Sequence, residues 1–192
     1  MKPKVLAFAG STREDSSNKK AVKIAAAGAK QAGAEVEFID IRDYPVPGYD
    51  AELEDKSGLP DNAKKLKQKM IVSDGLLVST PEYNGSTSGV LKNLLDWASR
   101  KEQGDKPGVT IFNHKVAIIM SASTSWRGGI LGQRHLRDIF MHEGCLVLPI
   151  SQHVSNSREA FNADGSLIDS ERQVAVMDLG KTLVEFLQKL HT

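Results

Sequence analysis

Short apolar stretches alternate with longer amphipathic stretches along the whole chain of 192 residues. Each short stretch is followed by a glycine, a proline or a polar residue, which is typical of strands buried on both faces of a sheet. We expect five such strands, at residues 5–9, 36–39, 75–79, 115–120 and 145–148. Strands that alternate with helices form βαβ units, so the pattern predicts a mostly parallel sheet with helices on both faces.

The stretches between these strands have helical spacing. In residues 88–99 the apolar positions Val90, Leu91, Leu94 and Leu95 recur on one face. We expect helices at residues 17–32, 62–73, 88–99, 129–142 and 169–190. Asp61 is a candidate N-cap of the second helix, and Gly33 a stop for the first. The proline- and glycine-rich residues 41–60 predict a long irregular loop, and the polar residues 101–113 predict a connector between the helix at 88–99 and the strand at 115–120. The total length predicts one domain over residues 1–192.

Charge and cysteine content exclude several classes of protein. The formal net charge is +1, with basic and acidic residues spread evenly, so nucleic acid is an unexpected partner. Cys145 is the only cysteine, which excludes an intrachain disulfide and a cysteine zinc site, and its apolar surroundings predict a buried, inert thiol. The five histidines lack ligand spacing, so we expect no metal. With no apolar run of about 20 residues and too short a run for a signal peptide, we expect a cytoplasmic protein that does not enter membranes.

Three loops are candidates for a binding site. In a parallel sheet, ligands bind beyond the carboxyl ends of the strands, where the strand order reverses. The loops after the first, third and fourth predicted strands are residues 10–18, 80–87 and 121–129.

The first of these loops suits a phosphate group. It leads from a strand into a helix, where free backbone N–H groups and the helix dipole attract anions. Its hydroxyl, amide and guanidinium groups belong to Ser11, Arg13, Ser16, Ser17 and Asn18. The loop lacks the later glycines of the dinucleotide-binding motif, and its side chains suit a terminal monophosphate better than a pyrophosphate. Plain helix capping is the alternative interpretation.

The other two loops suit a flat ring. In residues 80–87, Asn84 and Gly85 predict a tight turn that presents backbone donors and acceptors beside the ring of Tyr83. A βα turn with a solvent-facing tyrosine is the alternative. The glycine pair and small hydroxyl residues of 121–129 allow a ligand to approach the backbone closely, although a mobile connector has the same composition.

Three motifs together resemble the NADPH-dependent FMN reductase family. They read Gly10-Ser11-x-Arg13-x-x-Ser16-x-Asn18, then Thr80-Pro81-Glu82-Tyr83-Asn84-Gly85-Ser86-x-x-Gly89-Val90-Leu91-Lys92-Asn93-x-Leu95-Asp96-Trp97, then a serine-rich loop before Gly128-Gly129-x-x-Gly132-x-Arg134. The resemblance covers residues 3–150. It implies a flavodoxin-like three-layer sandwich with a five-stranded parallel sheet of order 2-1-3-4-5, in a family that includes flavin, quinone, azo-dye and chromate reductases.

The resemblance also implies roles for individual residues. The residues expected to hold the FMN phosphate and nearby ribityl oxygens are Ser11, Arg13, Ser16, Ser17 and Asn18. Those expected along the isoalloxazine ring are Pro81, Glu82, Tyr83, Asn84 and Gly85 on one side, and Ser121 and Ser123 on the other. Residues 124–127 depart from the family pattern: Trp126 and Arg127, next to Gly128, are expected to narrow the substrate channel or to bind the extra phosphate of NADPH.

The implied reaction passes a hydride from NADPH or NADH to flavin N5 and then to a small acceptor, such as a quinone, free flavin, azo compound or chromate. No protein side chain is expected to act as a catalytic acid, and Glu82 is expected to anchor its loop. A homodimer or homotetramer is implied. Two alternatives stay open: a flavodoxin-like electron carrier, for which the near-zero charge is unusual, and a dinucleotide enzyme that uses Asp40, for which the glycines are missing.

Overall fold

A computed structural model describes residues 2–102, 104–105 and 110–190. Its centre is a parallel sheet of order β2-β1-β3-β4-β5, which confirms the expected class and strand order, and a sixth short strand also pairs with β4. The strands are β1 (Lys4–Ala9), β2 (Glu35–Asp40), β3 (Gly75–Thr80), β4 (Val116–Ala122), β5 (Leu146–Val147) and β6 (His153–Val154).

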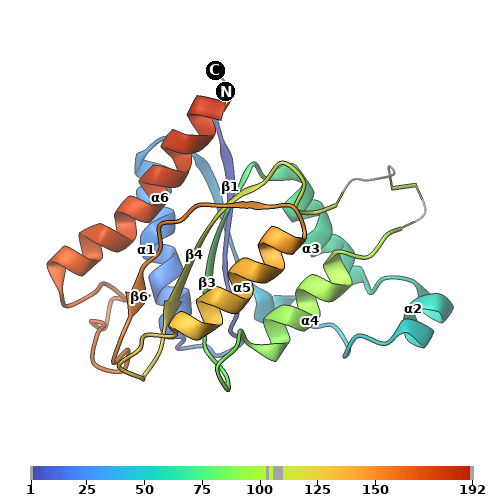
Figure 1. Cartoon of the computed structure of the whole chain (residues 1–192), viewed down its shortest axis with the longest axis horizontal. Helices are drawn as coiled ribbons and strands as arrows, with labels where there is room; N and C mark the ends of the chain where they lie inside the picture. Colours follow the sequence, from blue (N-terminus) through green and yellow to red (C-terminus); the bar gives the residue numbers. More distant parts are fainter. Residues whose placement is uncertain (1, 103, 106–109, 191–192) are drawn as a thin grey trace.

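Helices cover both faces of the sheet (Figure 1). They are α1 (Ser17–Gln31), α2 (Ala51–Ser57), α3 (Asp61–Val72), α4 (Gly89–Ala98), α5 (Ile130–His142) and α6 (Ser170–Leu190). Successive side chains of a strand point to opposite faces. Val5 and Ala7 of β1 therefore pack with α1 and α6, whereas Leu6 and Phe8 pack with α3, α4 and α5. Both faces of β1, β3 and β4 are buried, as their continuous apolar runs predict, whereas the edge strand β2 is only partly buried.

Helices α1 and α6 lie against each other through two glycines. A Cβ atom on Gly28 would lie 1.9 Å from the backbone oxygen of Met177, and one on Gly180 would lie 1.9 Å from that of Ala25. Neither position has room for a side chain, so the backbones of the two helices approach closely here. This contact packs the second half of α1 against α6.

The expected strand at residues 145–148 is shorter than predicted and is continued by a separate strand. β5 covers only Leu146–Val147, and the chain returns to β4 at β6. Between them lies Pro149, which has no N–H to donate to the sheet. The proline therefore accounts for the gap, and β6 brings the chain back to the carboxyl end of β4.

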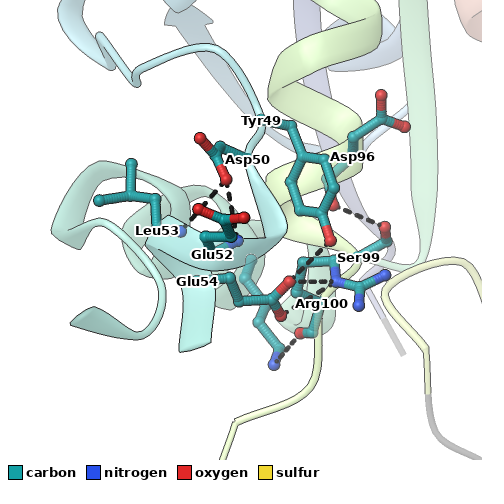
Figure 2. Close-up of polar contacts among 9 residues, drawn as sticks. Tyr49, Asp50, Glu52, Leu53, Glu54, Asp96, Ser99 and Arg100 are labelled. Carbon is teal, nitrogen blue, oxygen red and sulfur yellow. Dashed lines mark hydrogen bonds and ion pairs between the residues drawn. The ribbon is translucent and has the colours of Figure 1, made fainter. Parts of the chain in front are cut away.

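The expected irregular loop at residues 41–60 contains two helices. A 3-10 turn covers Ile41–Asp43, and α2 follows, although none of its residues is buried. Polar contacts hold α2 near α4 (Figure 2): the Tyr49 hydroxyl donates to Glu54 Oε2 at 2.8 Å, and Arg100 Nε lies 3.0 Å from both oxygens of Glu54. Because apolar periodicity was the signal for helices, a helix without a buried face was missed.

Two smaller expectations also need correction. Asp61 is the first residue of α3 rather than its N-cap, and Pro60 before it makes no capping hydrogen bond. The stretch 101–113, expected as a polar connector, places Ile111 and Phe112 in the core, while residues 103 and 106–109 lie outside the described part. In contrast, Gly33 follows α1 with a φ of 96°, as expected for a helix stop. Among the described residues, no helix has the length and apolar character needed to cross a bilayer.

Candidate functional site

The loops 10–18, 80–87 and 121–129 meet at the carboxyl ends of β1, β3 and β4, the lower end of the molecule in Figure 1. They surround a cavity of about 130 Å³. Nine predicted site residues line it, namely Ser11, Arg13, Ser16, Ser17, Asn18, Pro81, Glu82, Tyr83 and Ser123. Three further residues also line it: Ala122 and Thr124, which belong to the predicted loop 121–129, and Ser157, which does not.

The first turn of α1 forms one wall of this cavity. Ser16 is the N-cap, with extended backbone, and its hydroxyl oxygen accepts a hydrogen bond from the Lys19 N–H at 3.4 Å. Ser11 Oγ accepts from the Arg13 N–H at 3.3 Å, and the Ser17 hydroxyl donates to Ser157 O at 3.5 Å. Capping therefore does account for Ser16, as the alternative interpretation proposed. The positive end of the helix dipole still faces the cavity.

Arg13 is an exposed cation at this cavity. Its guanidinium makes no hydrogen bond or ion pair with any described residue. The acidic residues that follow it have other partners: Glu14 lies 3.8 Å from Arg42, and Asp15 lies 2.5 Å from Lys20. An unpaired guanidinium beside two serine hydroxyls and a helix N-terminus suits the dianionic phosphate of FMN.

Asn18 is buried, and its side chain is bonded to two neighbouring strands. Asn18 Nδ2 donates to Ala122 O at 2.8 Å, while Asn18 Oδ1 accepts from the Ala122 N–H and from the Ser79 hydroxyl, both at 2.8 Å. These bonds use Oδ1 and one of the two Nδ2 hydrogens, and they fix the start of α1 against the ends of β3 and β4. Contact between the Asn18 amide and the phosphate stays a prediction.

The second loop is a tight hairpin turn. Tyr83 and Ser86 exchange two backbone hydrogen bonds, of 2.9 and 3.0 Å. Asn84 and Gly85 between them have positive φ angles, of 50° and 75°. This is the geometry of a two-residue turn with both central residues left-handed, as the Asn-Gly sequence predicts. Asn84 and Gly85 do not line the cavity, whereas the half-exposed Tyr83 ring lies at its rim.

Glu82 joins this loop to the start of α5. Its Oε2 accepts hydrogen bonds from the N–H groups of Leu131 at 2.9 Å and Gly132 at 3.3 Å. Gly129, the N-cap of α5, supplies no side-chain hydrogen bond, so Glu82 bonds N–H groups that a helix leaves free at its start. Its negative charge also meets the positive end of the helix dipole. The expected anchoring contact is thus present.

In the third loop, Ser123 lies at the cavity and Ser121 does not. Ser123 lines the cavity, and its N–H donates to Val154 O at 3.0 Å. Ser121 does not line it: its hydroxyl donates to Gly128 O at 2.6 Å and accepts from Gln133 Nε2 at 2.7 Å. The Ser121 hydroxyl is buried and away from the cavity, so the structure does not bring it together with the other predicted site residues, and its contact with a flavin stays a prediction.

The residues expected along the substrate channel lie outside the cavity. The Trp126 side chain is 74% exposed, and the Arg127 guanidinium lies 5.1 Å from the centre of its ring. Gly128 has a φ of 63°, and a Cβ there would lie 2.7 Å from a ring carbon of His153. Gly128 thus serves the turn, while Trp126 and Arg127 form an exposed stacked pair.

Ser157 lines the cavity although no motif in the sequence indicated it. Its N–H donates to Ser123 O at 3.0 Å, which folds the chain after β6 over the third loop. It lies in the C-terminal forty residues, for which the motifs gave no match. Ser157 could be placed at the cavity only with the knowledge that β6 pairs with the end of β4.

Other polar groups have partners that limit their roles. Asp40 lies 2.5 Å from Lys19 and accepts from the Arg42 N–H, so no carboxylate is left free at the end of β2 to bind a ribose. Cys145 is buried, and burial raises its pKa to about 12. Within residues 2–102, 104–105 and 110–190, no group of three His, Cys, Asp or Glu side chains could hold a metal.

The strand order, and a phosphate-sized cradle at the switch point beside an aromatic rim, define a flavodoxin-like flavin-binding domain. Comparison with known proteins agrees. The model of the NADPH-dependent FMN reductase family matches residues 3–159, and this chain belongs to that family.

Three relatives illustrate the similarity. The chain is 33% identical over 189 residues to an NAD(P)H-dependent FMN reductase of Pseudomonas aeruginosa, covering 97% of this chain and 96% of that one. It is 34% identical over 187 residues to a 2-hydroxy-1,4-benzoquinone reductase of a Burkholderia species, with 97% and 93% covered. The solved structure of FerB, an NAD(P)H:acceptor oxidoreductase of Paracoccus denitrificans, aligns with a TM-score of 0.77 and 28% identity over 97% of this chain and 98% of that one.

Proposed function

We propose that the chain is an FMN-dependent NAD(P)H oxidoreductase whose acceptor is a quinone. One observation carries the proposal: the three loops form one cavity, and the unpaired Arg13 guanidinium lies at it. Two relatives support the choice of acceptor, the benzoquinone reductase of Burkholderia and an NADPH:quinone oxidoreductase of Arabidopsis thaliana, which is 30% identical over 192 residues. Because both relatives are named as enzymes, their similarity favours an enzyme over an electron carrier.

The chain's own groups bind and orient the cofactor. Ser11, Arg13, Ser17 and the first N–H groups of α1 would hold the phosphate. The cavity of about 130 Å³ is smaller than typical ligand pockets, so it would take the phosphate and ribityl chain, and Pro81 and Tyr83 at the rim would bind the ring. When bound, FMN supplies the hydride chemistry. Backbone N–H groups at the ring edge would stabilise its negative charge after reduction, and no protein acid is needed.

Trp126 and Arg127 extend the site toward the nucleotide donor. Both are exposed at the tip of the loop that contains Ser123, a residue of the cavity wall. We assign to Arg127 the recognition of the 2′-phosphate that distinguishes NADPH from NADH, because guanidinium groups bind phosphate through several donors. Trp126 would cover one face of the bound nicotinamide.

We also propose that two or four copies associate beside this site in the cytoplasm. Four large apolar side chains are exposed near it, namely Tyr83, Val90, Trp126 and Ile130. A second copy covering them would complete the walls of the ring site. Light scattering on the purified protein tests this, and a monomer at micromolar concentration contradicts it.

Steady-state kinetics test the proposed reaction. With FMN bound, NADPH and a quinone varied together should give parallel double-reciprocal lines, since the two substrates use one site in turn. Intersecting lines would contradict the shared site. Lack of turnover with any quinone, flavin or azo compound would contradict the enzyme itself.

A further inference from the structure

A groove of about 430 Å³ runs along α1 and begins beside the phosphate cavity. The two share Ser16, the N-cap of α1. The opposite wall is formed by the turn at residues 162–166, closed by an Asn162 N–H to Ser166 O bond of 2.8 Å, and by the first part of α6. No group of the proposed reaction uses this groove.

Charged side chains of both signs line the groove: Lys19, Lys20 and Lys23 on α1, Glu14 before the helix, and Asp164 in the opposite turn. Ser16 and Lys20 are four residues apart and therefore lie on the same side of α1. The Lys20 ammonium pairs with Asp15 at 2.5 Å, and the Asp15 carboxylate is 78% exposed. Such surface pairs contribute little stability, so Lys20 can exchange this partner for another anion at small cost. A second phosphate group, bonded to the phosphate proposed to bind at the start of α1, would lie within reach of the Lys20 ammonium.

The far end of the groove suits a flat heterocyclic base. Ile24 and Ala27 of α1 and Met177 of α6 supply apolar surface there. Gln173 also lines the groove; its Oε1 accepts from the Leu167 N–H at 2.9 Å, which leaves its amide N–H groups to donate. A base therefore finds apolar contact for its face and a donor for its edge.

The dimensions of the groove fit a nucleoside monophosphate. Ten residues separate Ser17 from Ala27, which corresponds to about 15 Å along a helix. The volume of about 430 Å³ lies within the range of known small-molecule pockets. The groove thus extends from the phosphate end of the proposed FMN site over the length of a further nucleotide unit.

We infer that this groove binds the AMP half of FAD, so that the chain accepts FAD as well as FMN. The inference rests on the proposed function, since the first phosphate and the ring of FAD would take the positions proposed for FMN. The sequence alone favoured a terminal monophosphate, because the first loop lacks the glycines of a dinucleotide motif. In the groove, Lys20, one turn further along α1 than Ser16, would bind the second phosphate of FAD.

The experiment titrates the flavin-free protein with FMN and with FAD and follows flavin fluorescence. The wild type should bind the two with Kd values within about tenfold of each other. Ala27→Trp fills the far end of the groove and should raise the Kd for FAD at least about tenfold while leaving that for FMN unchanged. Gln31→Trp, an exposed position one turn further along the same helix and outside the groove, is the matched control and should change neither.

Lys20→Ala is the second variant, so the test does not depend on folding of Ala27→Trp. It should weaken FAD more than FMN. The inference is overturned if the wild type binds FMN but excludes FAD, or if Ala27→Trp and Lys20→Ala leave FAD binding unchanged or weaken both flavins equally. It is also overturned if Ala27→Trp instead raises the KM for NADPH in the FMN-loaded protein. Binding of neither flavin would remove the proposed function as well.

Discussion

The side-chain amide of Asn18 is hydrogen-bonded to the backbone of Ala122 in both directions, at 2.8 Å each way. The amide thus acts as an additional strand residue beside the end of β4. A third bond, from the Ser79 hydroxyl, adds the end of β3. One side chain therefore fixes the relative positions of all three loops around the cavity.

Replacing Asn18 should destabilise the fold and weaken flavin binding together. Asn18→Ala leaves the Ala122 N–H and C=O unsatisfied in a buried place, which costs about 2–3 kcal/mol in the free energy of unfolding. Urea denaturation of the flavin-free protein measures this. Asn62→Ala, which removes an exposed amide bonded to Pro45 O, should cost less than about 0.5 kcal/mol. Equal stability of the two variants would contradict the role of Asn18.

Replacing Arg13 should weaken FMN binding without destabilising the protein. The guanidinium makes no hydrogen bond with a described residue, so Arg13→Ala should leave the free energy of unfolding unchanged. Loss of a charge-assisted contact with the phosphate should cost about 1.5–3 kcal/mol of FMN affinity, or roughly 10- to 150-fold in Kd. Riboflavin, which has no phosphate, is the control ligand. If Arg13→Ala weakens riboflavin equally, the phosphate assignment is wrong.

Features that depend on adjacent residues could be predicted from the sequence. The turn at Asn84 and Gly85 follows from the freedom of both residues to adopt positive φ. The prediction of the buried strands relied on apolar runs, and the prediction of their order relied on the family resemblance. The place where the loops meet followed from the general rule for parallel sheets, and nine of the predicted residues do line one cavity.

Features that depend on distant partners could not be predicted. Asn18 and Ala122 are 104 residues apart, and nothing local indicates that the amide is used for the scaffold. Ser121 looked like a ligand-facing serine, but Gln133 on α5 and Gly128 bind its hydroxyl. Helix α2 has no buried residue, so the apolar pattern that revealed the other helices was absent there.

Glu82 should act through its contacts with α5 rather than through proton transfer. Glu82→Gln keeps an oxygen to accept from Leu131 and Gly132, so this variant should retain most activity and the wild-type pH profile of kcat. Glu82→Ala removes the acceptor and should cost about 1–2 kcal/mol of stability. A loss of activity in Glu82→Gln with unchanged stability would indicate proton transfer instead.

Arg127 should select between the two nicotinamide donors. Arg127 is exposed, and among the described residues its guanidinium makes no hydrogen bond or ion pair beyond its stacking on Trp126, so Arg127→Ala should leave stability unchanged. Its loss should raise the KM for NADPH up to about tenfold and leave that for NADH unchanged. Arg172→Ala on α6 is the matched control and should change neither KM. Equal changes for both donors would remove the assignment to the 2′-phosphate.

Anaerobic stopped-flow spectroscopy of the FMN-loaded protein tests the central proposal most directly. Mixing with NADPH should bleach the visible absorption of the flavin, and a second mixing with a quinone should restore it at a rate that accounts for turnover. Bound flavin that stays oxidised after NADPH is added, while free quinone is not consumed, would contradict the assignment of this chain as an FMN-dependent NAD(P)H oxidoreductase.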